Sequence, residues 1–196
     1  MATLEFFYDF VSPYSYLAST RVDEIARRTG AALRYRPFLL GGVLKATGNR
    51  APLETAAKFS HMWTDLQRWS KRLKVPISAP HPTFPFASIL ALRAALAADQ
   101  QGQLPAFTRA VYRAAWGEGG DVSSPESLTR VLVEAGLDGA ALVAAAPEHK
   151  AALAAQTDEA VRRGAFGAPT FFVGEEMFVG NDRLDFVEEA LRRSEG

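Results

Sequence analysis

The sequence contains no cysteine, which excludes disulfides, cysteine metal sites and a thiol nucleophile carried by the protein itself. Histidine is almost as scarce, since only His61, His81 and His149 occur among the 196 residues. They lie far apart, and no two of them have the spacing that places two metal ligands on one helix face. We therefore expect no metal site and no chemistry that depends on a cysteine of this chain.

Net charge and long apolar runs are also lacking. Lys+Arg and Asp+Glu both number 22, so the formal charge is zero and nothing favours binding to nucleic acid or to an anionic membrane. No apolar run is long enough to span a bilayer. The first residues lack the basic start and apolar stretch of a secretory signal. We expect a cytoplasmic protein with neither a nucleic-acid nor a membrane partner.

The beginning of the sequence has the pattern of a strand, a helix and a second strand. Residues 4–10 are aromatic and apolar, which is typical of a buried strand. Ser12 and Pro13 form a helix-start signal, and a helical pattern of apolar residues then runs on to Gly30. Residues 32–38 predict the second strand. Because such a unit connects its strands by a crossover, we expect these two strands to be parallel.

The middle of the sequence is predominantly helical. Residues 41–42 and 47–52 have the composition of loops. From about residue 53 to 163 the sequence is rich in alanine and has helical periodicity, with no convincing strand. With 48% apolar residues, the chain can form one compact unit or one domain that carries a large insertion.

The end of the sequence returns to an α/β pattern. Residues 170–173 and 176–179 predict two short strands, and Gly174-Glu175 between them suits a tight hairpin turn. Asp182 then opens a final helix through Leu191, with Asp185 as a loose capping-box analogue.

The order of these elements is that of the thioredoxin fold. We expect an α/β protein in which residues 1–50 and 164–196 form the thioredoxin-like domain. Residues 51–163 then form an all-helical domain inserted after the first strand–helix–strand unit.

The segment Ser12-Pro13-Tyr14-Ser15 lies between the first strand and helix, where thioredoxin-like redox proteins carry C-x-x-C. The free N–H groups and the dipole of a helix N-terminus lower the pKa of a thiol there. A serine hydroxyl can donate a hydrogen bond to a thiolate bound from outside the chain. The alternative is that Ser12 only caps the helix, as we expect for Ser124 before Pro125.

Two later segments complete the candidate site. Ala168-Pro169 precedes a strand, where thioredoxin-like proteins place a cis proline, and Ala168 then offers its backbone to a peptide-like ligand such as glutathione. The alternative is a plain loop-ending proline. Gly180-Asn181-Asp182 allows Asp182 to pair with the ammonium group of a γ-glutamyl residue, or forms an ordinary helix cap.

These residues carry a family resemblance along nearly the whole chain. The sequence resembles 2-hydroxychromene-2-carboxylate isomerases and, more broadly, kappa-class glutathione transferases. The segments that match are Phe7–Leu17, Gly48–Arg50, Asp65–Trp69, Trp116–Gly119, Phe166–Thr170 and Gly180–Leu184.

The resemblance implies a role for each matching residue. Ser12 matches the catalytic serine that hydrogen-bonds the glutathione sulfur, and Asn49 matches an asparagine that contacts glutathione. Ala168, before the cis proline Pro169, matches the residue that pairs with the cysteinyl backbone. The residues that match the segment holding the γ-glutamyl end are Val179, Gly180, Asn181 and Asp182.

Other parts of the likeness concern the second substrate. Residues near Phe38, Asn49 and Phe84 are expected to line its pocket. Residues 116–118 contact substrate or, in the favoured interpretation, pack the domain interface. The sequence differs most from the naphthalene-pathway isomerases after Asn49 and over residues 81–88, where those enzymes carry more polar and basic residues.

The function that the resemblance implies is glutathione-dependent isomerisation of a 2-hydroxychromene-2-carboxylate-type substrate. The thiolate adds reversibly to a conjugated carbon of this electrophilic small molecule, so glutathione is a cofactor that is regenerated. The alternatives are a kappa-type transferase or peroxidase and a non-catalytic binding module on a thioredoxin-like scaffold. The family likeness also implies a homodimer.

Overall fold

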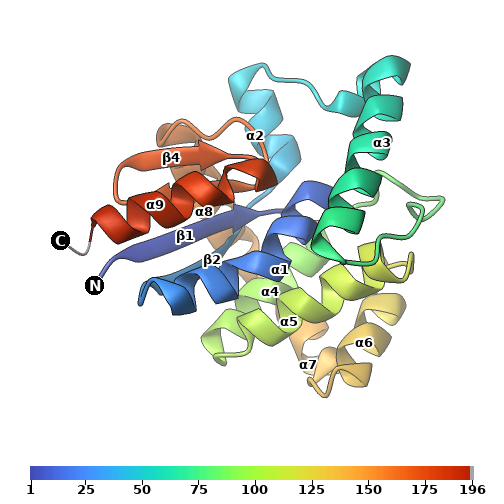
Figure 1. Cartoon of the computed structure of the whole chain (residues 1–196). Coiled ribbons are helices and arrows are strands. Elements are labelled where there is room, and N and C mark those ends of the chain that lie inside the picture. The colour runs from blue at the N-terminus through green and yellow to red at the C-terminus, as the bar shows by residue number, and fades with distance from the viewer. Residues whose placement is uncertain (195–196) are drawn as a thin grey trace.

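The computed structural model describes residues 1–194 and centres on a four-stranded sheet in the order β2-β1-β3-β4 (Figure 1). β1 (Thr3–Tyr8) pairs in parallel with β2 (Ala32–Pro37) and antiparallel with β3 (Thr170–Val173). β4 (Glu176–Val179) adds to β3 as a hairpin. The predicted parallel pair and hairpin are confirmed, although β1 ends two residues earlier than expected, before Asp9.

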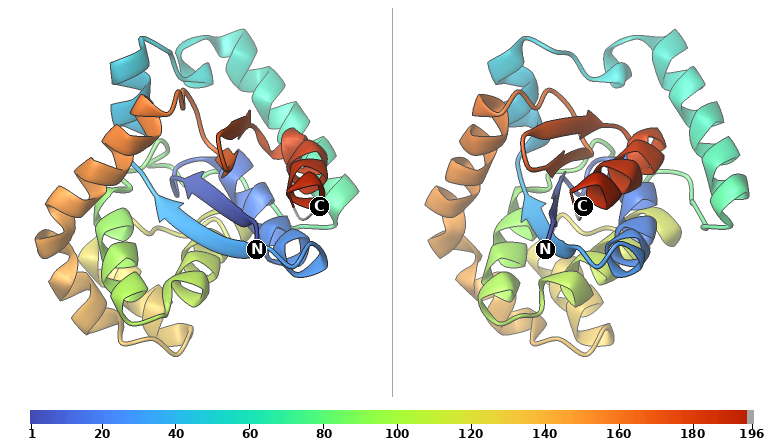
Figure 2. Two further views of the ribbon diagram at one scale, coloured as in Figure 1. Left: turned by 90° about the vertical axis from the view of Figure 1, so that its left-hand side faces the viewer. Right: turned by 60° about the vertical axis from the view of Figure 1, so that its left-hand side comes forward.

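Alternating side chains of β1 enter cores on opposite faces of the sheet. Leu4, Phe6 and Tyr8 pack with apolar residues of α1 (Pro13–Arg28) and α9 (Leu184–Arg193). Phe7 packs on the other face with Phe172 and with α8 (Lys150–Arg162). Figure 2 accordingly shows α8 and α9 on opposite sides of the strands. The sheet is thus covered on both faces, as a thioredoxin-like fold requires.

The chain between β2 and β3 is helical, as predicted, and no strand occurs there among the residues described. Its helices are α2 (Leu40–Thr47), α3 (Ala56–Leu73), α4 (Ile89–Gln100), α5 (Leu104–Tyr112), α6 (Pro125–Glu134), α7 (Gly139–Ala145) and α8, with short turns η1 (Pro52–Glu54), η2 (Arg113–Gly117) and η3 (Ala146–His149). Buried residues of α4 and α5 belong to the same apolar cluster as Phe6 and Tyr8. The division into two domains remains a prediction. Within residues 1–194, none of these helices has the length and apolarity needed to cross a bilayer.

The prediction of a loop at Gly41-Gly42 is wrong, because both residues lie in α2. Two contacts offset the weak helix propensity of glycine. The amide of Leu40, in the first turn, donates to the buried carboxylate of Asp9 at 2.8 Å. A Cβ on Gly42 would lie 3.2 Å from Thr157 Cγ2, so the missing side chain lets α2 lie close to α8. The expected loop begins only after Thr47, at Gly48.

The start of the last helix also differs from the expectation. Asn181–Arg183 form the 3₁₀ turn η4, and the regular helix α9 begins at Leu184. Among residues 1–194, no side chain caps α9, so Asp182 does not act as its N-cap and Asp185 completes no capping box. Gly180, with φ of 105°, instead turns the chain directly from β4 into η4.

Trp116 joins the helical region to the end of β1. Its side chain is 1% exposed, and its indole Nε1 donates to the carbonyl oxygen of Phe10 at 2.8 Å. Its ring packs edge-on against Phe84 and tilted against Phe86. These contacts support the packing interpretation of Trp116.

Replacing Trp116 with Phe should lower the free energy of unfolding by about 2–4 kcal/mol, because the variant leaves a buried carbonyl unpaired and a small void. Urea denaturation measures the change. The control is Trp63→Phe on α3, a half-buried site, where the loss should stay below about 1 kcal/mol. Equal losses at the two positions would contradict this role of Trp116.

Candidate active site

Ser12 lies at the N-terminus of α1, as the sequence predicts. Its Oγ accepts a hydrogen bond from the amide of Ser15 at 3.2 Å, and Pro13 occupies the first turn. The same Oγ donates to the carbonyl oxygen of Ala168 at 3.1 Å. The Ala168–Pro169 peptide bond is cis. The start of α1 therefore directly faces residues 166–169, which we call the proline loop.

Asn49 holds the proline loop from the other side. Its Nδ2 donates to the carbonyl oxygen of Phe166 at 2.8 Å, and its Oδ1 accepts the amide of Arg50. Gly48, with φ of 68°, ends α2 in the left-handed conformation that glycine favours and so directs the chain to Asn49. Asn49 thus contacts the segment that carries Ala168.

A cavity of about 510 Å³ opens beside these residues. Ser12, Asn49, Ala168 and Val179 all line it, so the structure brings these four predicted site residues together. The rest of the wall is largely apolar and includes Leu39, Leu40, Leu44, Leu53, Met62, Phe84, Phe86 and Ile89. This size and lining are typical of a small-molecule site.

The other predicted residues lie beside the cavity and do not form its wall. Gly180 donates its amide to the carbonyl oxygen of Pro169 at 2.9 Å, which fixes the end of β4 against the proline loop. Asn181 is 3% exposed, and its Nδ2 has no hydrogen-bond partner in the part of the chain that the structure describes. The exposed Asp182 pairs with Arg183 at 3.1 Å. Phe38, expected in the pocket, is instead buried under the sheet with Phe7.

Tyr14 connects the cavity to α3. Its hydroxyl donates to Asp65 Oδ2 at 3.0 Å, and burial together with this bond and the charges of Asp65 and Asp182 raises the pKa of the Tyr14 phenol. Tyr14 is therefore neutral at physiological pH.

Residues 116–118 do not line this cavity. The Trp116 ring packs edge-on against Phe84. Gly117 lies against the Tyr16 hydroxyl, and Glu118 pairs with Arg113 at 3.2 Å. Nor does any cluster of His, Asp and Glu in residues 1–194 have an arrangement that could hold a metal ion.

Asp9 is a cavity residue that the sequence analysis did not single out. Its side chain is completely buried, and burial raises the pKa of its carboxyl above the ordinary value. The available signal was an acidic residue within an otherwise aromatic and apolar segment, three residues before Ser12.

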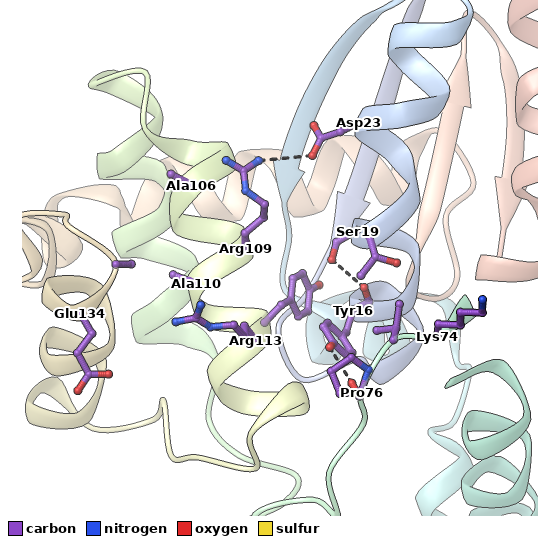
Figure 3. A pocket seen from close by; sticks show the side chains of 14 residues that line it. Tyr16, Ser19, Asp23, Lys74, Pro76, Ala106, Arg109, Ala110, Arg113 and Glu134 are labelled. Atoms are coloured by element: carbon purple, nitrogen blue, oxygen red, sulfur yellow. Dashed lines mark hydrogen bonds and ion pairs between the residues drawn. The ribbon is translucent and has the colours of Figure 1, made fainter. Parts of the chain in front are cut away.

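A second cavity, of about 710 Å³, lies between α1 and α5 (Figure 3). Arg109 and Asp23 form an ion pair across it at 3.5 Å, and the Tyr16 hydroxyl donates to the carbonyl oxygen of Pro76. None of the predicted site residues lines this cavity. The chemistry expected from the sequence therefore belongs to the cavity at Ser12.

A helix N-terminus that faces a cis proline at the start of a strand defines the thioredoxin-like class. A family model described as DSBA-like thioredoxin domain matches residues 3–192, which is nearly the whole chain.

Comparison with known proteins narrows this class. A 2-hydroxychromene-2-carboxylate isomerase of Sphingobium xenophagum is 38% identical over 193 residues, which cover 96% of this chain and 97% of that protein. Glutathione S-transferase kappa 1 of Homo sapiens is 28% identical over 207 residues, covering 96% and 90%. A solved structure of a 2-hydroxychromene-2-carboxylate isomerase superposes with a TM-score of 0.87 at 32% identity, covering 98% and 95%. The chain belongs to the DsbA-like thioredoxin family and, within it, to the group that contains the 2-hydroxychromene-2-carboxylate isomerases.

Replacing Gly180 with Ala should lower the free energy of unfolding by about 1–3 kcal/mol, because a φ of 105° is strained for alanine. The added Cβ would also lie 2.5 Å from Asp182 Oδ1 and displace that carboxylate. Chemical denaturation measures the loss. The control is Gly41→Ala in α2, where the new Cβ would have no heavy atom within 4 Å apart from its chain neighbours and the backbone of its own helix. Alanine there should be neutral or stabilising by up to about 1 kcal/mol, and a loss equal to that at Gly180 would contradict the strain argument.

Proposed function

We propose that this protein binds glutathione at Ser12 and uses it to isomerise a 2-hydroxychromene-2-carboxylate-type substrate. The observation that carries the proposal is the contact of Ser12 Oγ with the Ala168 carbonyl at the edge of an apolar cavity. The names of the relatives, at 38% identity and at a TM-score of 0.87, support it.

The residues present suit glutathione as a ligand. Ala168 precedes a strand and can pair with an extended peptide backbone. The buried Asn181 Nδ2 has no hydrogen-bond partner among residues 1–194. Asp182 supplies a carboxylate for the ammonium group of a γ-glutamyl residue. A polar atom left unpaired when buried is costly unless a ligand satisfies it, which favours a polar ligand here.

Ser12 is the residue that we assign to the thiolate. Its hydroxyl can rotate away from the Ala168 carbonyl once a peptide-like ligand donates its own N–H to that carbonyl. The freed O–H then points to an anion at the N-terminus of α1, where the helix dipole also favours negative charge. Bound glutathione supplies a thiolate that adds reversibly to a conjugated carbon of the substrate.

The apolar wall of the cavity suits an aromatic substrate and keeps water away from it. The wall contains only one cation among the described residues, Arg50, whose side chain is 83% exposed and pairs with Glu54 at 3.4 Å. Arg50 is positioned at the cavity edge to bind the carboxylate of an aromatic acid. The homodimer and the cytoplasmic location expected from the sequence remain predictions.

Replacing Ser12 with Ala should lower kcat/KM for isomerisation about 10- to 1,000-fold, because a preorganised donor to the anion is lost. Ser124→Ala is the matched control, since Ser124 also precedes a proline and caps a helix, α6, outside the cavity. Each variant should lose about 0.5–2 kcal/mol of stability with its cap. Only Ser12→Ala should lose turnover, and unchanged turnover in this variant would remove Ser12 from the mechanism.

Glutathione at about one hundred times its Kd should raise the melting temperature of the protein by about 5–10 °C. The same samples, incubated with a chromene carboxylic acid or a chloronitroaromatic compound, distinguish the activities. An isomerase leaves the glutathione concentration unchanged, whereas its consumption would indicate a kappa-type transferase. Absence of any glutathione-induced shift would contradict the proposal and favour a non-catalytic binding module.

A further inference from the structure

Asp9 is a buried carboxyl group without a cationic partner. It is 0% exposed and lies in the wall of the same cavity as Ser12. None of the lysines, arginines or histidines within residues 1–194 forms an ion pair with it, although many other carboxylates of the chain have one. A buried carboxylate of this kind is costly to keep charged, since nothing compensates the loss of hydration.

The hydrogen bonds of Asp9 permit both protonation states. Its Oδ1 accepts the amide of Val11 at 3.1 Å and its Oδ2 accepts the amide of Leu40 at 2.8 Å. The Ser88 side chain lies against the same carboxyl. A hydroxyl can donate to a carboxylate and can also accept from a carboxylic acid. Because each oxygen has a second lone pair, Asp9 can gain a proton without losing either amide bond.

The other titratable groups around Asp9 cannot exchange a proton near neutral pH. Tyr8 and Tyr112 pack beside it, and burial raises the pKa of both phenols well above the ordinary value. Tyr14, in the cavity wall, also has a raised pKa. Of the described residues that line the cavity, Asp9 is the only carboxyl group.

We propose that Asp9 accepts the proton that the thiol of glutathione loses when it becomes a thiolate at Ser12. This inference rests on the proposed function. The S–H bond breaks and its electron pair stays on sulfur, while an O–H bond forms on a carboxyl oxygen of Asp9. The thiol and the Asp9 carboxyl together carry one negative charge before and after this transfer. If the thiolate and the Asp9 carboxylate were both charged in one apolar site, each would oppose the ionisation of the other. Transfer of the thiol proton to Asp9 avoids this repulsion.

Calorimetric titration with glutathione at neutral pH, in buffers of different ionisation enthalpy, tests the proposal by counting protons released on binding. The ultraviolet absorbance of the thiolate is recorded on the same samples. For the wild type we expect a thiolate signal and almost no proton released to the buffer. For Asp9→Asn, whose amide cannot take up the proton, we expect about one proton released per thiolate formed.

The matched control is Asp121→Asn. Asp121 also accepts hydrogen bonds in a turn, from the amide of Ser123 at 2.9 Å and the hydroxyl of Ser127 at 3.0 Å, but lies outside the cavity. This variant should release as few protons as the wild type. Release of about one proton per thiolate by the wild type, or equal counts for the wild type and Asp9→Asn, would overturn the role of Asp9 while leaving the glutathione site intact.

An infrared difference spectrum of the wild type needs no variant, so it tests the proposal even if Asp9→Asn does not fold. Binding of glutathione should produce the carbonyl band of a protonated carboxylic acid. A thiolate signal without that band would contradict the inference about Asp9. Absence of both binding and a thiolate signal would instead contradict the proposed function itself.

Discussion

The hydrogen bond from Ser12 to the Ala168 carbonyl joins two points that are 156 residues apart in the sequence. Strand pairing makes this contact possible. Because β1 and β3 are antiparallel, with Phe7 opposite Thr170, the chain leaving β1 and the chain entering β3 lie at the same end of the sheet. The helix start that follows β1 and the proline that precedes β3 must then meet. The position of the candidate site is thus a consequence of sheet topology.

Packing on both faces of the sheet keeps this arrangement rigid. Phe6 stacks on Phe171 between the two strands, with ring centroids 5.4 Å apart, and Phe7 meets Phe172 edge-on. On the Phe7 face, Glu5 bridges Arg36 and Arg163, both at 2.7 Å. Fully buried aromatic side chains that interdigitate allow little relative movement of β1 and β3. A rigid scaffold of this kind holds the Ser12 hydroxyl in place before any ligand arrives.

The sequence predicted what short-range patterns determine. The hairpin strands at residues 170–173 and 176–179 and the cap at Ser12 follow from local residue types and their order, and the structure has each of them. The cis proline at Pro169 was expected from the likeness to thioredoxin-like proteins, and the structure has it too. The helix at Gly41-Gly42 was missed because its support comes from Asp9 and α8, which are distant in sequence. Asp9 itself was missed for a related reason, since its contacts with Leu40, Ser88 and Tyr112 come from later parts of the chain.

The wall of the cavity has one part that is anchored in the sheet and another, apolar part that comes from the inserted helices and loops. Ser12, Ala168 and Val179 belong to elements anchored in the sheet, whereas Leu53, Met62 and Phe84 come from η1, α3 and a loop. α3 is attached to α1 mainly through Met62, Leu66 and Leu17 and through the Tyr14–Asp65 bond. Substitutions in these peripheral segments can reshape the apolar wall and leave the sheet-anchored contacts unchanged. Divergent descendants of one ancestor can in this way come to accept different small molecules while they inherit the same contact between Ser12 and Ala168.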